Sequence, residues 1–238
     1  MKEITPYPEI DAPKKSLVAK MFNNIAPKYD FLNRFLSVGI DTMWRKKMLK
    51  KIPYHPQHML DVATGTGDLV LLANKYLAPA KITAVDIAEA MIEIGRKKSG
   101  HLPHVSFATA DAENMPFPDN HFDLITVAFG IRNFENLENG LKEMHRVLQN
   151  DKICAILEFS IPANKLFKGL YMFYFRNILP FIGRIISGDP RAYTYLFESV
   201  QSFPYGENLA AILIKCGFKN VQYFPVTGGI ATIYIAKK

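Results

Sequence analysis

The sequence predicts an α/β fold in which a doubly wound, mostly parallel sheet of seven strands carries helices on both faces. Three observations support this prediction. An apolar run that ends near Val62 leads directly into a turn with two glycines. From Met59 onward, strand-like apolar runs alternate with helical patterns, as in linked β-α-β units. Only Pro225 to Gly229 separates the last two strand-like runs, too few residues for a crossover helix, so the seventh strand must run antiparallel to its neighbour.

A helical segment, residues 16–58, precedes the first strand. It contains an amphipathic stretch from Ser16 to Ile25, an aromatic stretch from Tyr29 to Leu36, and a basic helix that ends before Pro53. We expect these helices to cover the glycine turn as a lid that excludes water and admits substrate. The first 15 residues are polar and proline-rich and are expected to be a flexible N-terminus.

The lid and the sheet are predicted to form one domain over residues 16–238. Its regular elements follow one another in alternation. Strands are expected near 59–63, 81–86, 105–109, 122–128, 152–159, 220–224 and 230–236, with helices near 68–77, 88–98, 135–149 and 205–217.

Residues 162–204 interrupt this alternation after the fifth strand. The segment is rich in aromatic and aliphatic residues and is predicted to be a helical insert on the ligand side of the sheet. Two interpretations stay open: a helical pair that buries its own core, or a greasy groove or membrane-facing cap for a substrate with a long apolar tail.

The glycine turn is the first candidate binding site. Gly65 and Gly67 have no Cβ, so the backbone can adopt positive φ and a ligand can approach it closely at the carboxyl end of a strand. A plain surface turn is the alternative. Val70 stands where a dinucleotide fingerprint would have its third glycine, and Asp61 and Asp68 would repel a pyrophosphate. We therefore expect an adenosyl ligand without phosphate, and S-adenosylmethionine with its positive sulfonium is the obvious candidate.

Two further strand ends carry carboxylates. Asp86, followed by Ile87, ends the second strand, and its two acceptor oxygens suit the hydroxyls of a ribose. Asp111 and Ala112 follow the third strand, where a carboxylate and a backbone N–H can recognise adenine. A helix cap at Asp86 and a turn at Asp111 are the structural alternatives.

The fourth strand ends in Arg132 and Asn133, at the edge where substrates bind. An arginine and an amide can hold a phenolate oxygen and a neighbouring carbonyl or hydroxyl, and a permanently protonated guanidinium suits charge stabilisation better than base catalysis. Tyr29 and Asp30 on the lid are candidates to orient or deprotonate a hydroxyl. A surface ion pair is the alternative role for Arg132.

Composition excludes several classes of protein. The chain has 238 residues, of which 49% are hydrophobic and 21% charged, as expected for a filled globular domain. Cys154 and Cys216 have no C-x-x-C spacing, which argues against disulfides and zinc and fits a reducing cytoplasm. Two His-x-x-His pairs in loops lack further ligands, so no metal is expected. The apolar stretch from Leu166 to Ile186 is interrupted by charges and a proline, which argues against a spanning helix.

Charge is unevenly distributed along the chain. Residues 1–58 and 162–238 each carry a net charge of +6, whereas residues 59–161 carry −5. Basic flanks with many aromatics fit nucleic acid, an anionic membrane surface, or a solvated face, and the charge pattern alone leaves these open.

Several longer motifs resemble the menaquinone/ubiquinone biosynthesis C-methyltransferase family over about Val18 to Lys237. The chain departs from the family pattern at Asp41, usually histidine, at Leu32, usually methionine, and at Ala128, where some members have serine. Asp111 stands before Ala112 where the family usually has asparagine. Gln149-Asn150-Asp151-Lys152 replaces the Lys-Pro-Gly-Gly turn that is common in the family. The matching stretches are Tyr29-Asp30-Phe31-Leu32-Asn33 with Ser37 and Trp44, Phe129-Gly130-Ile131-Arg132-Asn133, Arg146-Val147-Leu148 with Leu157-Glu158-Phe159-Ser160, Tyr195-Leu196-Phe197-Glu198-Ser199, and Thr227-Gly228-Gly229-Ile230.

The resemblance implies a class I methyltransferase with a Rossmann-like sheet. It implies that Thr66, Asp86 and the Asp111-Ala112 pair contact S-adenosylmethionine, that Arg132 assists ring activation, and that Asn133 and Tyr29 lie near the substrate. The implied reaction is C-methylation of a polyprenylated quinol in menaquinone or ubiquinone biosynthesis, without a metal.

Two rival functions stay open: methylation of RNA or a small soluble acceptor, and a non-catalytic, cofactor-binding scaffold for quinone synthesis. The aromatic insert favours an isoprenoid tail over nucleic acid, and the retained Arg132, Asn133 and Tyr29 argue against a scaffold. A cytoplasmic protein is expected, with peripheral contact at the inner face of the membrane and a homodimer as open options.

Overall fold

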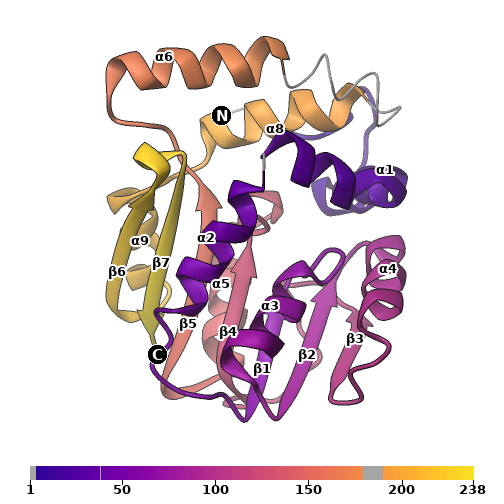
Figure 1. The fold of residues 1–238 in the computed structure, drawn as a ribbon, viewed down its shortest axis with the longest axis vertical. Coiled ribbons are helices and arrows are strands. Elements are labelled where there is room, and N and C mark those ends of the chain that lie inside the picture. Colours follow the sequence, from indigo (N-terminus) through magenta and orange to yellow (C-terminus); the bar gives the residue numbers. More distant parts are fainter. Residues whose placement is uncertain (1–3, 38, 179–189) are drawn as a thin grey trace.

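A seven-stranded sheet forms the centre of the computed structural model, which describes residues 4–37, 39–178 and 190–238 (Figure 1). The strand order is β3-β2-β1-β4-β5-β7-β6. The strands are β1 (His58–Val62), β2 (Lys81–Asp86), β3 (Val105–Thr109), β4 (Phe122–Ala128), β5 (Leu148–Phe159), β6 (Lys219–Val226) and β7 (Ala231–Lys237).

The strand directions confirm the predicted doubly wound sheet. β1 to β5 are parallel to one another, whereas β7 runs antiparallel to both β5 and β6. The short link before β7 is the turn η3 (Thr227–Gly229), in which Gly228 and Gly229 have φ values of 65° and 94°. All five parallel strands therefore end at one edge of the sheet, and the turns that follow them meet there.

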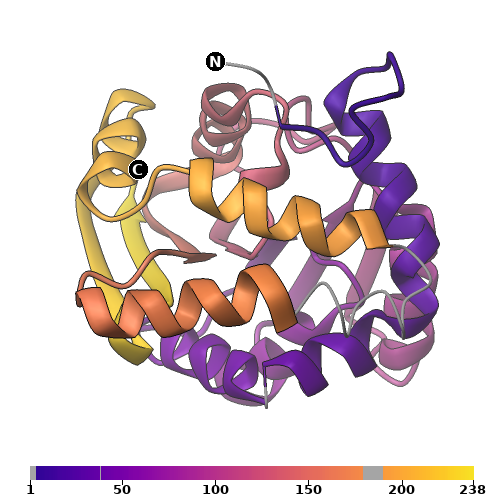
Figure 2. The ribbon, with the colours of Figure 1, turned by 90° about the horizontal axis from the view of Figure 1, so that it is seen from above.

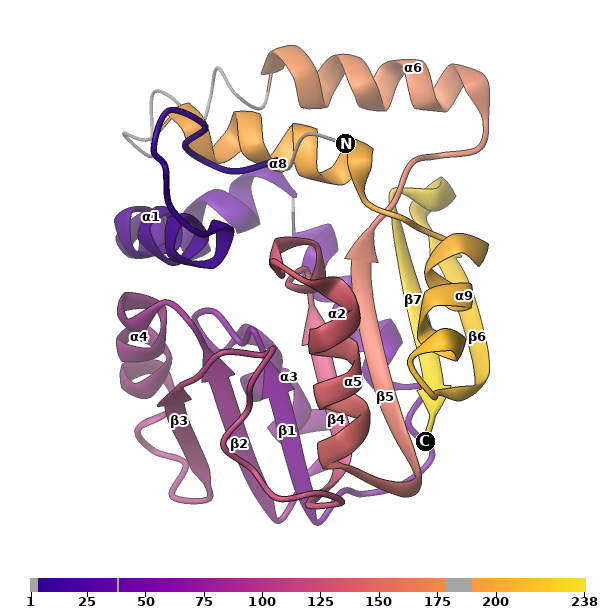
Figure 3. The ribbon, with the colours of Figure 1, turned by 180° about the vertical axis from the view of Figure 1, so that it is seen from behind.

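Helices cover both faces of the sheet (Figures 1 and 3). α2 (Ile40–Leu49) and α3 (Asp68–Leu77) lie on one face, and α5 (Leu137–Val147) and α9 (Glu207–Lys215) on the other, with α4 (Glu89–Ser99) beside β3. Fully buried side chains such as Leu60, Met144 and Leu213 fill the layer under α5 and α9. Met48, Leu69 and their neighbours fill the opposite layer.

A third group of helices stands above the carboxyl ends of the parallel strands (Figure 2). It comprises α1 (Lys14–Leu36), α6 (Lys165–Phe173) with the π-helical turn η2 (Tyr174–Ile178), and α8 (Pro190–Ser202). Leu17, Met21 and Ile25 follow helical spacing on α1 and are buried in one cluster with Tyr193 and Tyr195 of α8. The apolar insert thus packs against the N-terminal helix.

Some predicted boundaries were wrong. The amphipathic and aromatic stretches of the N-terminal segment join into one helix, α1, which begins at Lys14 and continues through Pro27. The helix expected over 135–149 begins at Leu137, because the Asn136 side chain accepts the N–H of Asn139 as an N-cap. It ends at Val147, because Leu148 pairs with Phe122 and already belongs to β5.

Two findings concern the ends of the chain and the membrane. Tyr7 is 8% exposed and belongs to the cluster that contains Leu17. No helix within the described ranges is both long and apolar enough to cross a membrane. The apolar stretch from Leu166 to Ile186 is described only in part, because Pro180 and Arg184, which interrupt it, lie outside the described residues.

Candidate active site

The two glycines of the turn after β1 have different neighbours. Gly65 and Gly67 both have positive φ, at 57° and 79°, which confirms the predicted backbone freedom. A Cβ on Gly67 would lie 3.1 Å from the Phe107 ring, so this glycine permits close packing against β3 and α4. Gly65 instead lines a pocket at the carboxyl end of β1, beside Tyr29.

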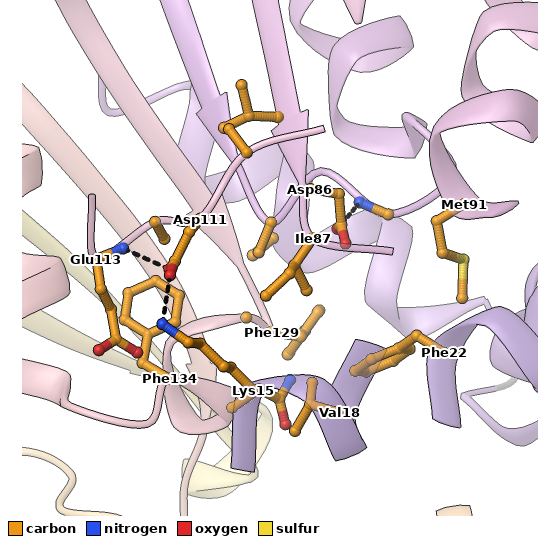
Figure 4. A pocket seen from close by; sticks show the side chains of 18 of the residues that line it. Lys15, Val18, Phe22, Asp86, Ile87, Met91, Asp111, Glu113, Phe129 and Phe134 are labelled. Atoms are coloured by element: carbon orange, nitrogen blue, oxygen red, sulfur yellow. Dashed lines mark hydrogen bonds and ion pairs between the residues drawn. The ribbon is translucent and has the colours of Figure 1, made fainter. Parts of the chain in front are cut away.

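Asp86 forms one side of this first pocket (Figure 4). Its carboxylate accepts the backbone N–H of Gly65 at 2.8 Å and that of Ala88 at 2.9 Å. Burial raises the pKa of Asp86, and the backbone donors oppose this shift. The carboxylate therefore holds the glycine turn and the residue before α4, and keeps lone pairs for a ligand hydroxyl. Ile87 lines the same wall.

Asp111 lies on another wall of the first pocket, with Ala112. It accepts the backbone N–H of Glu113 at 2.9 Å and the Nζ of Lys15 at 3.0 Å, and Figure 4 shows the lysine reaching it from α1. The hydrogen bond to Asp111 raises the pKa of Lys15. Lys14 donates to the carbonyl of Phe134 at 2.7 Å. The beginning of α1 is thus fastened to the loops after β3 and β4.

The residues of the first pocket fit an adenosyl group. Carboxylates at Asp86 and Asp111 suit a ribose diol and an adenine amine, and apolar side chains such as Ile87 and Phe134 offer surfaces for a flat base. The Oδ1 atom of Asn133 lines the pocket, is buried, and has no hydrogen-bond partner. Buried acceptors of this kind are normally satisfied, so this atom is a position for a ligand donor.

A second, larger cavity of about 430 Å³ opens beside the first. This volume falls in the range of roughly 300–1,000 Å³ typical of small-molecule sites. Its wall is mostly aromatic and aliphatic and comes from α1, α2, α6, η2, α8 and the ends of β4 and β5. The wall includes Met21, Ile25, Trp44, Phe159, Phe167, Leu170, Tyr171, Tyr174, Tyr193, Tyr195, Leu196 and Ile230.

Arg132 lines the second cavity. Its Nη1 lies 2.9 Å from Glu158 Oε1 and also donates to the carbonyl of Phe129. The guanidinium stands over the Phe159 ring, 5.4 Å from the centroid. The alternative of an ion pair is therefore realised, but inside the protein rather than on its surface. The Nε atom is buried without a hydrogen-bond partner and remains as a donor for a ligand.

The two cavities share one wall. Phe22, Tyr29 and Phe129 line both of them, whereas Asn133 lines only the first and Arg132 only the second. Successive residues after β4 thus serve different cavities. Burial raises the pKa of Tyr29, so its hydroxyl stays protonated at neutral pH and can donate a hydrogen bond at this junction.

Three residues of the predicted site lie beside the two cavities. Thr66 and Gly67 do not line the first pocket, but Thr66 lines a small adjoining pocket with Gly65. Asp30 lines neither cavity. The Thr66 hydroxyl donates to Asp30, and the Nζ of Lys98 lies 2.8 Å from Asp30 and also contacts Asp68. These four side chains tie α1 and α4 to the glycine turn, which gives Asp30 a structural role. The contact of Asp30 with a substrate hydroxyl stays a prediction.

The sequence analysis missed two charged residues at the second cavity: Glu158, which pairs with Arg132 behind the cavity wall, and Arg45, which lines the cavity. Glu158 interrupts a buried apolar strand, and a charge in such a place requires a counter-ion, so the pattern held a signal. From the sequence, Arg45 belongs only to the basic helix that ends before Pro53. It is 7% exposed, pairs with Asp41, and stands 5.2 Å from the centroid of the Phe129 ring. The part of the chain that the structure describes contains no group of three or more His, Cys, Asp or Glu arranged for a metal ion.

Comparison with known proteins gives three kinds of similarity. The ubiE/COQ5 methyltransferase family matches residues 10–238. A Bacteroides fragilis protein named demethylmenaquinone methyltransferase is 44% identical over 241 residues, which cover 100% of this chain and 98% of that protein. A Geotalea uraniireducens protein named ubiquinone/menaquinone biosynthesis C-methyltransferase is 47% identical over 230 residues, 94% of this chain and 97% of the relative.

Solved structures with low sequence identity share the fold. A Thermotoga maritima SAM-dependent methyltransferase superposes with a TM-score of 0.68 at 18% identity, covering 92% of this chain and 99% of that one. An Aquifex aeolicus SAM-dependent methyltransferase gives a TM-score of 0.58 at 22% identity, covering 81% and 88%. The architecture is therefore that of class I methyltransferases.

Proposed function

The chain belongs to the ubiE/COQ5 methyltransferase family, and from this membership we propose that it is an S-adenosylmethionine-dependent enzyme that methylates a ring carbon of a polyprenylated quinol. The quinol is of the demethylmenaquinol type, the corresponding benzoquinol type, or both. The names of the relatives support this class of substrate.

The observation that carries the proposal is the meeting of the two cavities. A pocket with carboxylates at Asp86 and Asp111 joins an apolar cavity of about 430 Å³ at Phe22, Tyr29 and Phe129. A donor in the first cavity and an aromatic acceptor in the second would face each other across this shared wall. Holding two reactants in such an arrangement supplies about 7–11 kcal/mol of barrier reduction.

The donor supplies an electrophilic methyl group on a positively charged sulfur. Attack by a ring carbon would form the new C–C bond and break the S–CH3 bond, so that S-adenosylhomocysteine leaves, and loss of the ring proton to water would restore the aromatic ring. This attack requires an electron-rich ring, so the acceptor is the reduced quinol. Loss of the hydroxyl proton makes the ring more electron-rich, and Arg132 is placed to stabilise, through its buried Nε, the negative charge that this loss leaves on the quinol oxygen. Glu158 compensates the charge of Arg132 in the resting site, so the guanidinium acts chiefly as an oriented hydrogen-bond donor.

Asn133 and Tyr29 have separate roles in this proposal. The unpartnered Oδ1 of Asn133 would accept a hydrogen bond from the donor molecule in the first pocket. Tyr29, at the junction, would donate to a quinol oxygen and exclude water. The family resemblance implies that Thr66 contacts the donor. In this structure the Thr66 hydroxyl bonds to Asp30, so Thr66 would act on the donor by holding the glycine turn in place.

The rival functions fit the cavity less well. Apolar side chains make up most of its wall, which suits an isoprenoid tail and offers little to a polar acceptor or to RNA phosphates. A non-catalytic scaffold would have no need for a buried, partly unsatisfied guanidinium, because leaving Nε unpaired costs stability.

The direct test combines purified protein, S-adenosylmethionine labelled on the methyl group, and a reduced prenylated naphthoquinol or benzoquinol in parallel reactions. We expect label to enter the lipid extract with at least one quinol and with neither oxidised quinone. Cofactor binding without transfer to either quinol would favour the scaffold, and transfer to RNA alone would refute the proposal.

A further inference from the structure

We propose that the outer face of α6 docks the protein on an anionic lipid surface. Three large apolar side chains on this helix are exposed: Leu166 at 78%, Leu170 at 64% and Phe173 at 61%. Their spacing of four and three residues places them on one side of an α-helix. An apolar stripe of this kind on a monomer marks an interaction surface.

Exposed cations share these elements with the stripe. Lys165, Lys168 and Arg176 are exposed on α6 and η2. Between Glu158 and Asp189 the sequence contains no acidic residue. A helix with an apolar face bordered by Lys and Arg is typical of segments that lie in the interface of a membrane and attract acidic headgroups.

The position of α6 agrees with this orientation. Figures 1 and 3 both show α6 as the helix farthest from the sheet, beyond α8. Its other side closes the second cavity through Phe167, whose ring packs over Gly228, and Leu170 at the border of the outer face also lines this cavity. One helix therefore presents an apolar face to the outside and forms the wall of the apolar cavity behind it.

A lipid surface explains these features together better than a protein partner does. Lysine is depleted from protein–protein interfaces, whereas here exposed lysines lie on the same helix as the stripe. Because Leu170 is exposed and also lines the cavity, an apolar tail embedded in the bilayer would reach the cavity along α6 without crossing water. This docking is a property of the surface and does not depend on which quinol is methylated.

The test is cosedimentation of the full chain with vesicles of phosphatidylcholine alone or mixed with phosphatidylglycerol. We expect binding chiefly to the mixed vesicles. The double variant Leu166→Glu/Phe173→Glu should lower the partition coefficient about tenfold or more, because it removes apolar insertion and adds anionic repulsion. Ile214→Glu on α9, which replaces a side chain of 60% exposure outside this face, should bind as the parent does.

A second set of variants tests the cations. Lys165→Gln/Lys168→Gln/Arg176→Gln should weaken binding to the mixed vesicles by about fivefold for each charge removed and flatten its salt dependence. Lys97→Gln on α4, also exposed, is the matched control. Melting temperature and cofactor affinity of all variants are expected to match the parent.

Two outcomes would overturn the proposal. One is unchanged vesicle binding by the Leu166/Phe173 variant. The other is that the parent does not bind vesicles and is a dimer, whereas the variant is a monomer. That result would assign the face to a second copy of the chain. Turnover of a short-tailed, water-soluble quinol without vesicles is measured separately, and its absence would count against the proposed reaction and not against docking.

Discussion

The guanidinium of Arg132 and the carboxylate of Glu158 form an ion pair inside the protein, with 2.9 Å between Nη1 and Oε1 and side-chain exposures of 8% and 1%. The same Glu158 oxygen accepts the backbone N–H of Phe159 at 2.9 Å. The pair connects the ends of β4 and β5 and fixes a charged group beside an apolar cavity. Two kinds of effect, on stability and on turnover, are therefore expected from the same residues.

The first prediction concerns Arg132→Ala. Turnover should fall by about 100-fold or more, because a donor aimed at developing charge is lost. Cofactor affinity should stay within a few-fold of the parent, because Arg132 lines only the second cavity. The measurements are kcat with a prenylated quinol and calorimetric titration with S-adenosylmethionine. Equal loss of both quantities would move Arg132 to the cofactor site.

A double variant separates the stability effect. Arg132→Ala leaves Glu158 buried without its counter-ion, which should cost about 3–5 kcal/mol in the free energy of unfolding. Arg132→Gln/Glu158→Gln carries no buried charge and should recover most of this loss in urea unfolding while turnover stays low. Recovery of turnover along with stability would show that Arg132 only supports the structure.

The second prediction concerns Asp86→Asn. The parent carboxylate accepts two backbone N–H groups and is proposed to accept ribose hydroxyls, and an amide offers only one acceptor oxygen. The dissociation constant for S-adenosylmethionine should rise about tenfold or more, in line with about 1.5–3 kcal/mol for a hydrogen bond to a charged group. Asp151→Asn, at an exposed position of β5, is the control and should leave affinity unchanged.

The third prediction concerns pH. Burial raises the pKa of Asp61 to about 6, although hydrogen bonds from Thr64 and Thr126 lower it in part. Between pH 4 and pH 6 the folded state therefore holds a proton that the unfolded state has released. The contribution of Asp61 to stability is therefore complete below about pH 4 and declines as pH rises through about 6, by about 3 kcal/mol.

The check for Asp61 is urea unfolding of the parent and of Asp61→Asn at pH 4.5 and at pH 7.5. The parent should lose stability relative to the variant as pH increases. A difference between the two proteins that is constant with pH, or one that grows in favour of the parent at high pH, would show that Asp61 is ionised in the folded state throughout.

The fourth prediction compares two glycines. A Cβ on Gly130 would come within 2.5 Å of the Ala63 Cβ, beside the first pocket, whereas nothing lies within 4 Å of one on Gly169 in α6. Gly130→Ala should cost about 1–3 kcal/mol and weaken cofactor binding. Gly169→Ala should be neutral or add up to about 1 kcal/mol through helix propensity. Melting temperatures and cofactor titrations check both, and equal effects would contradict the pocket geometry.

Much of the sheet could be predicted because its signals are local. The ranges 81–86, 105–109 and 122–128 agree with β2, β3 and β4, and 68–77 agrees with α3. Apolar runs bounded by turn residues set these limits. The boundary at Leu148 was missed because a buried leucine suits a helix end and a strand start equally well, and only pairing with Phe122 decides between them.

The site was predicted in part for the same reason. Gly65, Asp86, Ile87, Asp111 and Ala112 line one pocket because parallel topology brings successive strand ends to one edge. Contacts between distant segments were not foreseen. Lys15 reaches Asp111 across 96 positions of sequence, and the Lys98–Asp30 pair spans 68. Neither partner carries a local pattern that points to the other.

One helix, α1, supplies Tyr29 and Phe22 to the boundary between the cavities and Lys15 to the far end of the first. A displacement of the whole helix would therefore open both cavities at the same time. A ligand in either cavity that contacts α1 therefore stabilises the closed position of this helix and slows dissociation of a ligand from the other cavity. By thermodynamic reciprocity, binding of the donor should change the affinity for the acceptor by the same factor by which binding of the acceptor changes the affinity for the donor.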